Sequence, residues 1–154
     1  MMLEQGGVLP AVSLKDADGV DFTLESYRGK PLVVYFYPKA DTPGCTNEAK
    51  DFTALADEYA AAGVPVIGIS KDKPAKLKKF AEKYGLTVIL ASDEPGDACE
   101  GFGTWVEKSL YGRKYMGIER ATFLAGADGT ILRVWPKVKV KGHAAEVLEA
   151  VQAL

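Results

Sequence analysis

The chain contains three short apolar runs separated by two helical patterns, and this alternation constrains its fold more than any other feature. The runs are PLVVYFY, VPVIGIS and TVILASD, at residues 31–37, 64–70 and 87–93. They are rich in β-branched and aromatic residues without polar alternation, which is typical of strands buried on both faces. Between them we predict one helix that begins at Pro43 and ends before Gly63, and another over residues 74–84. This order predicts an α/β fold, a mixed central sheet flanked by helices on both faces.

Turn signals define the remaining elements. Asp18-Gly19 separates two short runs and predicts an N-terminal β-hairpin, and Asp128-Gly129 predicts a second hairpin near the C-terminus. Residues 143–154 are expected to form a closing helix that buries Val147, Leu148 and Val151. The segment GDACEGFG indicates a short helical turn, and we expect an irregular stretch after it, through Gly103 and Gly112.

Composition narrows the class of protein. The chain has 154 residues, 47% hydrophobic and 26% charged, with a net charge of −2. We therefore expect one domain over residues 1–154 that binds neither nucleic acid nor membrane. The first ten residues lack the pattern of a secretory signal, so we expect a cytoplasmic protein. The alternative is a mature form from which a targeting segment has been removed. The chain has one histidine, His143, and two cysteines 54 positions apart, so we expect no metal site and no cofactor.

One of the two cysteines, Cys45, follows Thr42-Pro43-Gly44 at an expected helix start. Thr42 suits the N-cap and Pro43 the first helical position, which puts Cys45 at the third. There the free amides and the helix dipole favour the nucleophilic thiolate over the thiol. Gly44, without a Cβ atom, would let a small substrate approach the sulfur. The alternative is that Cys45 is a small buried core residue, but its polar and glycine neighbours argue against this.

The segment YPKADTPGCTNEAKDF resembles the active site of the peroxiredoxins, in which Pro, Thr and Cys have the spacing of Pro38, Thr42 and Cys45. It is most similar to the Q-type peroxiredoxins, also called bacterioferritin comigratory proteins. The likeness continues in PVIGIS, GFGTWVEKSLYGRKYMGIERATFL and ADGTILRVWPKVKVKGHAAEVL, and so spans nearly the whole chain. It implies a thioredoxin-like fold with an N-terminal extension and a thiol-dependent peroxidase acting on hydrogen peroxide and organic hydroperoxides.

The resemblance implies roles for individual residues. Cys45 would be the peroxidatic cysteine, which attacks a peroxide oxygen and becomes a sulfenic acid. Thr42 would donate its hydroxyl to the peroxide, or serve only as an N-cap. Pro38 would shield the sulfur, or simply end the strand. Arg120 would stabilise the thiolate; the alternation in ERATFL places it on one face with Thr122, a position that calls for an anionic partner.

Two further residues match the family with weaker expectations. Glu48 lies one helical turn after Cys45, and we expect an accessory polar role or a solvated position on the helix. Trp105 would form an apolar wall near the site, or would pack in the core.

The family pattern breaks at position 50. Many members carry a resolving cysteine five residues after the peroxidatic one, and this chain has Lys50 there. We prefer a one-cysteine mechanism, in which thioredoxin, glutaredoxin or a small thiol reduces the sulfenic acid of a monomer. The alternatives are that Cys99 resolves it within the chain or bridges to another subunit, although Cys99 could also be a packing residue.

Two other functions would also use a reactive cysteine. A disulfide oxidoreductase of the thioredoxin type normally has two cysteines three residues apart. The second cysteine would be at position 48, which is glutamate, so the sequence does not favour this function. A non-catalytic redox sensor or chaperone would use the same Cys45 thiol without turnover.

Overall fold

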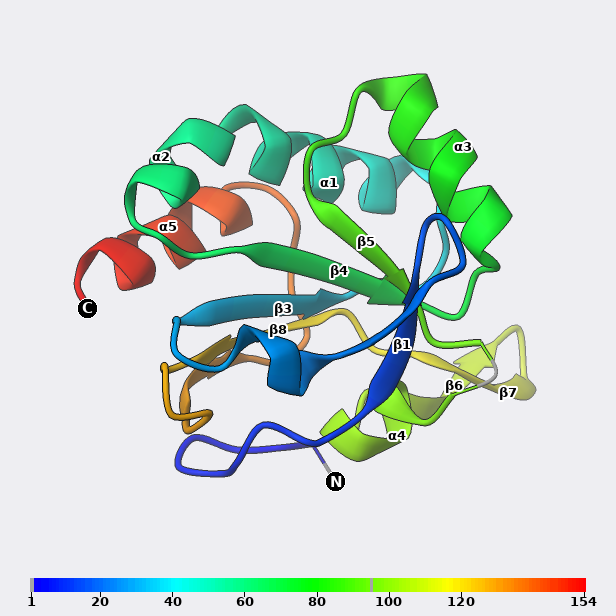
Figure 1. The fold of residues 1–154 in the computed structure, drawn as a ribbon. Helices are drawn as coiled ribbons and strands as arrows, with labels where there is room; N and C mark the ends of the chain where they lie inside the picture. Colours follow the sequence, from blue (N-terminus) through cyan, green and yellow to red (C-terminus); the bar gives the residue numbers. More distant parts are fainter. Residues whose placement is uncertain (1, 95) are drawn as a thin grey trace.

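The computed structural model describes residues 2–94 and 96–154 and centres on a seven-stranded mixed sheet (Figure 1). The strand order is β2-β1-β5-β4-β3-β8-β9. Strands β3, β4 and β5 are mutually parallel, while the other pairs are antiparallel. The strands span Ser13–Asp16 (β1), Asp21–Thr23 (β2), Leu32–Phe36 (β3), Val66–Ser70 (β4), Ile89–Ser92 (β5), Ala121–Ala125 (β8) and Ile131–Trp135 (β9).

Helices cover the two faces of the sheet unequally. The longer helices lie together on one face, and the other face carries the N-terminal segment with two short helices (Figure 1). The first group is α1 (Pro43–Ala54), α2 (Ala56–Ala61), α3 (Pro74–Tyr84) and α5 (His143–Gln152). The second is the 3-10 helix η1 (Leu24–Tyr27) and α4 (Ala98–Phe102). The expected mixed sheet with helices on both faces is confirmed.

The sheet divides the core into two clusters, because successive side chains of a strand point to opposite faces. In β3, Val33 and Tyr35 belong to the cluster under the longer helices, and Val34 and Phe36 to the other. All five residues of β3 are buried, which explains the uninterrupted apolar run in the sequence. Cys45 belongs to the first cluster. Cys99 belongs to the second.

A close aromatic contact sets α1 against the sheet. The Tyr35 ring stacks on Phe52 of α1 with 4.8 Å between ring centroids. The same ring crosses Gly68 of β4, where an added Cβ atom would lie 2.6 Å from Tyr35 Cζ. Real Cβ atoms do not approach so closely, so a glycine at position 68 lets the ring lie across β4.

Most expected elements are present, and two expectations are wrong. Both hairpins form at their predicted turns, and β1 also pairs with β5, so the N-terminal hairpin extends the main sheet. The helix expected to run unbroken to Gly63 is interrupted at Leu55, which separates α1 from α2. The stretch expected to be irregular is a second, two-stranded sheet of β6 (Trp105–Leu110) and β7 (Arg113–Ile118).

The β6–β7 hairpin turns through Tyr111-Gly112, both with positive φ, 51° and 77°. Such a pair of residues is typical of a tight hairpin turn whose twist matches that of the strands. The strands show little burial, so the sequence carries no apolar alternation that could have revealed them.

Candidate active site

Cys45 lies where the sequence placed it, at the third residue of α1 after Pro43. Its side chain is buried, with 2% of the residue exposed. Thr42 holds the N-cap position with an extended backbone, but its hydroxyl makes no capping hydrogen bond and instead donates to the Lys39 carbonyl at 2.7 Å. The expected capping role of that hydroxyl is therefore wrong. Pro43 has no amide hydrogen, and the Thr46 amide donates to the Thr42 carbonyl at 2.8 Å. The amides of Gly44 and Cys45 are therefore the first-turn donors that could serve a ligand of Cys45.

Arg120 reaches Cys45 from the sheet. It immediately precedes β8, whose Ala121 pairs with Phe36 at the carboxyl end of β3, the end from which the chain continues to α1. Arg120 Nη2 donates to Cys45 Sγ at 3.2 Å. Arg120 Nη1 donates to Glu48 Oε1 at 2.6 Å. One guanidinium thus bridges the sulfur and a carboxylate, the anionic surroundings that the sequence led us to expect for Arg120.

Glu48 is buried rather than solvated, with 1% of the residue exposed, so the expectation of a solvated helix position is wrong. Its second oxygen, Oε2, has no hydrogen-bond partner among the described residues. Burial raises the pKa of the Glu48 carboxyl to about 7, and the Arg120 guanidinium opposes this shift without cancelling it. A group that changes charge near neutral pH therefore lies against the arginine that contacts Cys45.

The loop before α1 is fastened to the neighbouring helix by contacts that the sequence did not reveal. Asp41 has a left-handed backbone, with φ of 62°, and its carboxylate accepts hydrogen bonds from Lys83 Nζ at 3.0 Å and Tyr84 Oη at 2.6 Å. The Ala40 amide donates to Asp72 Oδ2 at 2.8 Å. These partners lie more than 30 positions away, so no local sequence signal could have identified them.

Gly44 makes room for the arginine. A Cβ atom at this position would lie 3.3 Å from Arg120 Nη2, tighter than ordinary van der Waals contact.

Pro38 follows β3 and is exposed at the surface. Trp105 packs against the second core cluster, and its ring centroid lies 5.0 Å from Lys71 Nζ. It is half-buried, and the cluster it packs against lies on the opposite face of the sheet from Cys45.

Cys99 lies in α4, fully buried on the face opposite Cys45. Its amide donates to Asp93 Oδ2 at 2.9 Å, and the same carboxylate oxygen pairs with Lys71 Nζ at 3.1 Å. Burial, followed by the Asp93 charge, raises the pKa of the Cys99 thiol well above its usual range. The protonated form is therefore favoured, and the thiol is a poor nucleophile here.

His143, the only histidine, is the first residue of α5 and is buried, with its ring edge-on to Phe52 of α1. Its Nε2 lies 2.7 Å from Thr122 Oγ1, in hydrogen-bonding distance. Burial lowers the pKa of the imidazole to about 4, so the ring is neutral near pH 7 and serves as a polar core residue.

Comparison with known proteins identifies the family of the chain. The model of the AhpC/TSA family matches residues 6–134. The chain belongs to this family. It is 46% identical over 148 residues to a putative peroxiredoxin Bcp of Coxiella burnetii, which covers 96% of this chain and 98% of the relative. It is 48% identical over 141 residues to peroxiredoxin Bcp of Escherichia coli, covering 92% of this chain and 90% of the relative.

A solved structure extends the likeness to three dimensions. The bacterioferritin comigratory protein of Xanthomonas campestris, described for its alkyl peroxide reduction activity, superposes with a TM-score of 0.88 at 40% identity, covering 95% of this chain and 97% of that one. The chain is thus a Q-type peroxiredoxin with a thioredoxin-like fold, and it has the thiol-dependent peroxidase activity of that class. It lacks the cysteine five residues after Cys45 that many members carry. In the described residues of this peroxiredoxin, no helix is long and apolar enough to cross a membrane.

Proposed function

We propose that Cys45 is the peroxidatic cysteine and that it reduces hydrogen peroxide and organic hydroperoxides with an external thiol as the reductant. The observation that carries this proposal is the 3.2 Å contact between Arg120 Nη2 and Cys45 Sγ. A cation against the sulfur favours the thiolate, and the thiolate is the nucleophile.

The chemistry follows from this contact. The thiolate attacks one peroxide oxygen, an S–O bond forms, the O–O bond breaks, and an alcohol or water leaves after taking up a proton. Cys45 is thereby oxidised to the sulfenic acid. Negative charge spreads along the line from the sulfur to the leaving oxygen, and Arg120 with the first-turn amides of α1 can donate to it. The Thr42 hydroxyl would have to release the Lys39 carbonyl before it could donate to a peroxide.

A one-cysteine cycle is supported by the position of Cys99. The two sulfurs belong to core clusters on opposite faces of the sheet, and both are buried. A disulfide needs Cα atoms within about 7 Å, which would require α1 or α4 to leave the sheet. An external thiolate instead attacks the Cys45 sulfur and forms a mixed disulfide, while the sulfenic hydroxyl takes up a proton and leaves as water; a second thiol then releases the Cys45 thiol and forms the reductant's disulfide.

Turnover separates this proposal from a redox sensor or chaperone. Peroxide consumption with dithiothreitol as the reductant is measured for the wild type, Cys45→Ser and Cys99→Ser. We expect many turnovers per chain for the wild type and Cys99→Ser, and none for Cys45→Ser. Consumption of a single peroxide per chain in the wild type would contradict the enzyme role of Cys45 and favour the sensor.

A turnover rate in Cys99→Ser far below that of the wild type would favour the two-cysteine cycle. The choice of thioredoxin, glutaredoxin or a small thiol, the monomeric state, the single domain and the cytoplasmic location stay predictions.

A further inference from the structure

A lysine-rich connector runs from β9 to α5 beside the site. Residues 137–141 read KVKVK, and we call Lys137, Lys139 and Lys141 the lysine strip. The two valines between them are half-buried, and Val138 packs against the core cluster that contains Cys45. All three lysines are exposed. The connector therefore has an apolar inner side against the site and a basic outer side.

The connector is bonded directly to the site. The Val138 amide donates to the backbone carbonyl of Arg120 at 2.9 Å, and Arg120 is the residue whose side chain touches Cys45 Sγ. Lys137 and Lys139 flank that bond, and Lys137 has a positive φ of 53°. The hydrogen bond of Val138 thus fixes the position of the strip next to Arg120.

The strip carries positive charge that the chain does not neutralise. In the part of the chain that the structure describes, none of its three ammonium groups has a carboxylate within ion-pair distance. The nearest acidic residue along the chain, Glu146, pairs instead with Arg133 at 3.8 Å. The whole chain has a net charge of −2, so this concentration of positive charge is local. Three like charges without a partner repel one another unless a ligand neutralises them.

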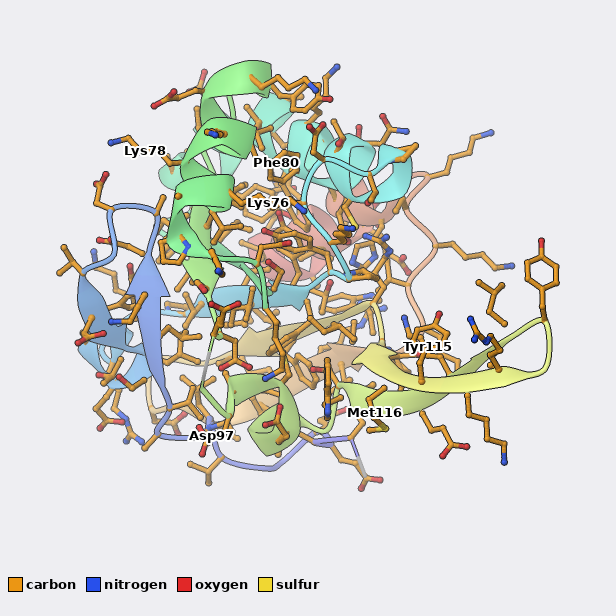
Figure 2. The ribbon with its side chains drawn as sticks, turned by 90° about the vertical axis from the view of Figure 1, so that its right-hand side faces the viewer. Lys76, Lys78, Phe80, Asp97, Tyr115 and Met116 are labelled. Atoms are coloured by element: carbon orange, nitrogen blue, oxygen red, sulfur yellow. The ribbon has the colours of Figure 1, made fainter. Side chains whose placement is uncertain are left out.

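An aromatic residue lies on the same side of the molecule. In Figure 2 the β6–β7 hairpin and the connector lie toward the same side of the view, and Tyr115 and Met116 lie on opposite sides of the hairpin. Tyr115 is 47% exposed. The hairpin also adds Arg113, exposed and without an ion pair among the described residues. Together with tryptophan, tyrosine and arginine are enriched among the strong contacts in protein interfaces.

We propose that the lysine strip and Tyr115 form a docking surface for an acidic dithiol protein that reduces the Cys45 sulfenic acid. The proposal rests on the one-cysteine function above, and names the class of its reductant. Hydrogen peroxide is small and uncharged, so a basic strip and an exposed aromatic ring would not help the protein to bind it. A protein reductant must bring a thiolate to a buried sulfur, and complementary charge steers it there. An aromatic anchor suits a partner with an extended surface better than a small thiol.

The experiment compares two charge-matched triple variants. The strip variant is Lys137→Glu, Lys139→Glu and Lys141→Glu. The control is Lys30→Glu, Lys73→Glu and Lys79→Glu, three exposed lysines on other parts of the surface that also lack ion pairs among the described residues. Reduction is measured with a thioredoxin of net negative charge and with neutral dithiothreitol, at low and high salt. Peroxide attack is measured separately, with tert-butyl hydroperoxide and with an anionic fatty-acid hydroperoxide.

We expect the strip variant to lose about tenfold or more in kcat/KM for the acidic thioredoxin at low salt, and the control to lose little. The loss should shrink at about 1 M salt, where charges are screened beyond about 3 Å. Tyr115→Ala should raise KM for thioredoxin at both salt concentrations. Turnover with dithiothreitol and peroxide attack should be unchanged in every variant.

Equal losses in the strip variant and the control would overturn the proposal, as would a loss with dithiothreitol. So would a defect confined to the anionic hydroperoxide, which would make the strip a substrate site. If dithiothreitol supports turnover and thioredoxin does not, the docking proposal is wrong and the peroxidase proposal stands. If no thiol supports turnover, the peroxidase proposal itself fails.

Discussion

Replacing Glu48 with glutamine removes a buried charge while keeping an oxygen that can accept from Arg120. The Glu48 carboxyl is buried, one oxygen lacks a partner among the described residues, and its pKa rises from 4.5 to about 7. Between these two values the folded chain holds a proton that the unfolded chain has released. The contribution of Glu48 to the free energy of unfolding therefore falls as the pH rises through this window, by about 3 kcal/mol in total. Glutamine does not titrate, so the variant should not show this loss.

Urea unfolding from pH 4.5 to pH 8 tests this reasoning. Both proteins carry Cys45→Ser, so that oxidation of the thiol does not affect the comparison. We expect the protein with the added Glu48→Gln substitution to gain stability over its parent as the pH rises, up to about 3 kcal/mol above pH 7. Glu149→Gln, at an exposed position of α5, should leave the pH dependence unchanged. A difference between the two proteins that stays constant with pH would refute the account of the buried carboxylate, whereas the titration of His143, whose pKa is lowered, is common to both and cancels in that difference.

Three other substitutions test separate contacts. Arg120→Ala should slow peroxide attack about 10²–10³-fold, because a donor aimed at the developing charge is lost, and stopped-flow fluorescence would show it; an unchanged rate removes Arg120 from the chemistry. Gly68→Ala should cost about 1–3 kcal/mol in urea unfolding, because the new Cβ atom collides with the Tyr35 ring; a neutral result would mean that the ring moves freely. Asp93→Ala should destabilise by at least about 1–2 kcal/mol, since it removes both hydrogen bonds to the start of α4 and leaves Lys71 without this partner; full stability would contradict its structural role.

The fold could be predicted from the sequence mainly where the strands are buried on both faces of the sheet. The strands β3, β4 and β5 are buried on both faces, so their apolar runs stood out against helices that begin at Pro43 and Pro74. The β6–β7 hairpin was missed because its strands are mostly exposed and carry mixed residues. The break at Leu55 was missed because no glycine or proline marks it.

The candidate site was predictable in its local part only. The third-residue position of Cys45 follows from Thr42-Pro43-Gly44, without any knowledge of the fold. The burial of Glu48 does not follow from the local sequence, because a lone charge on a helix normally faces solvent. Its burial depends on the ion pair with Arg120, 72 positions away. The chain pairs the two only when β8 forms beside β3.

Mass spectrometry after one equivalent of hydrogen peroxide tests most directly the claim that Cys45 reacts and that Cys99 does not resolve it. Wild type and Cys99→Ser are treated without reductant, trapped with a sulfenic-acid reagent and digested. The account predicts the same Cys45 sulfenic adduct in both proteins, and no adduct or disulfide at Cys99. A disulfide between Cys45 and Cys99 in the wild type would contradict the account, because it would mean that the sheet does not keep the two sulfurs apart.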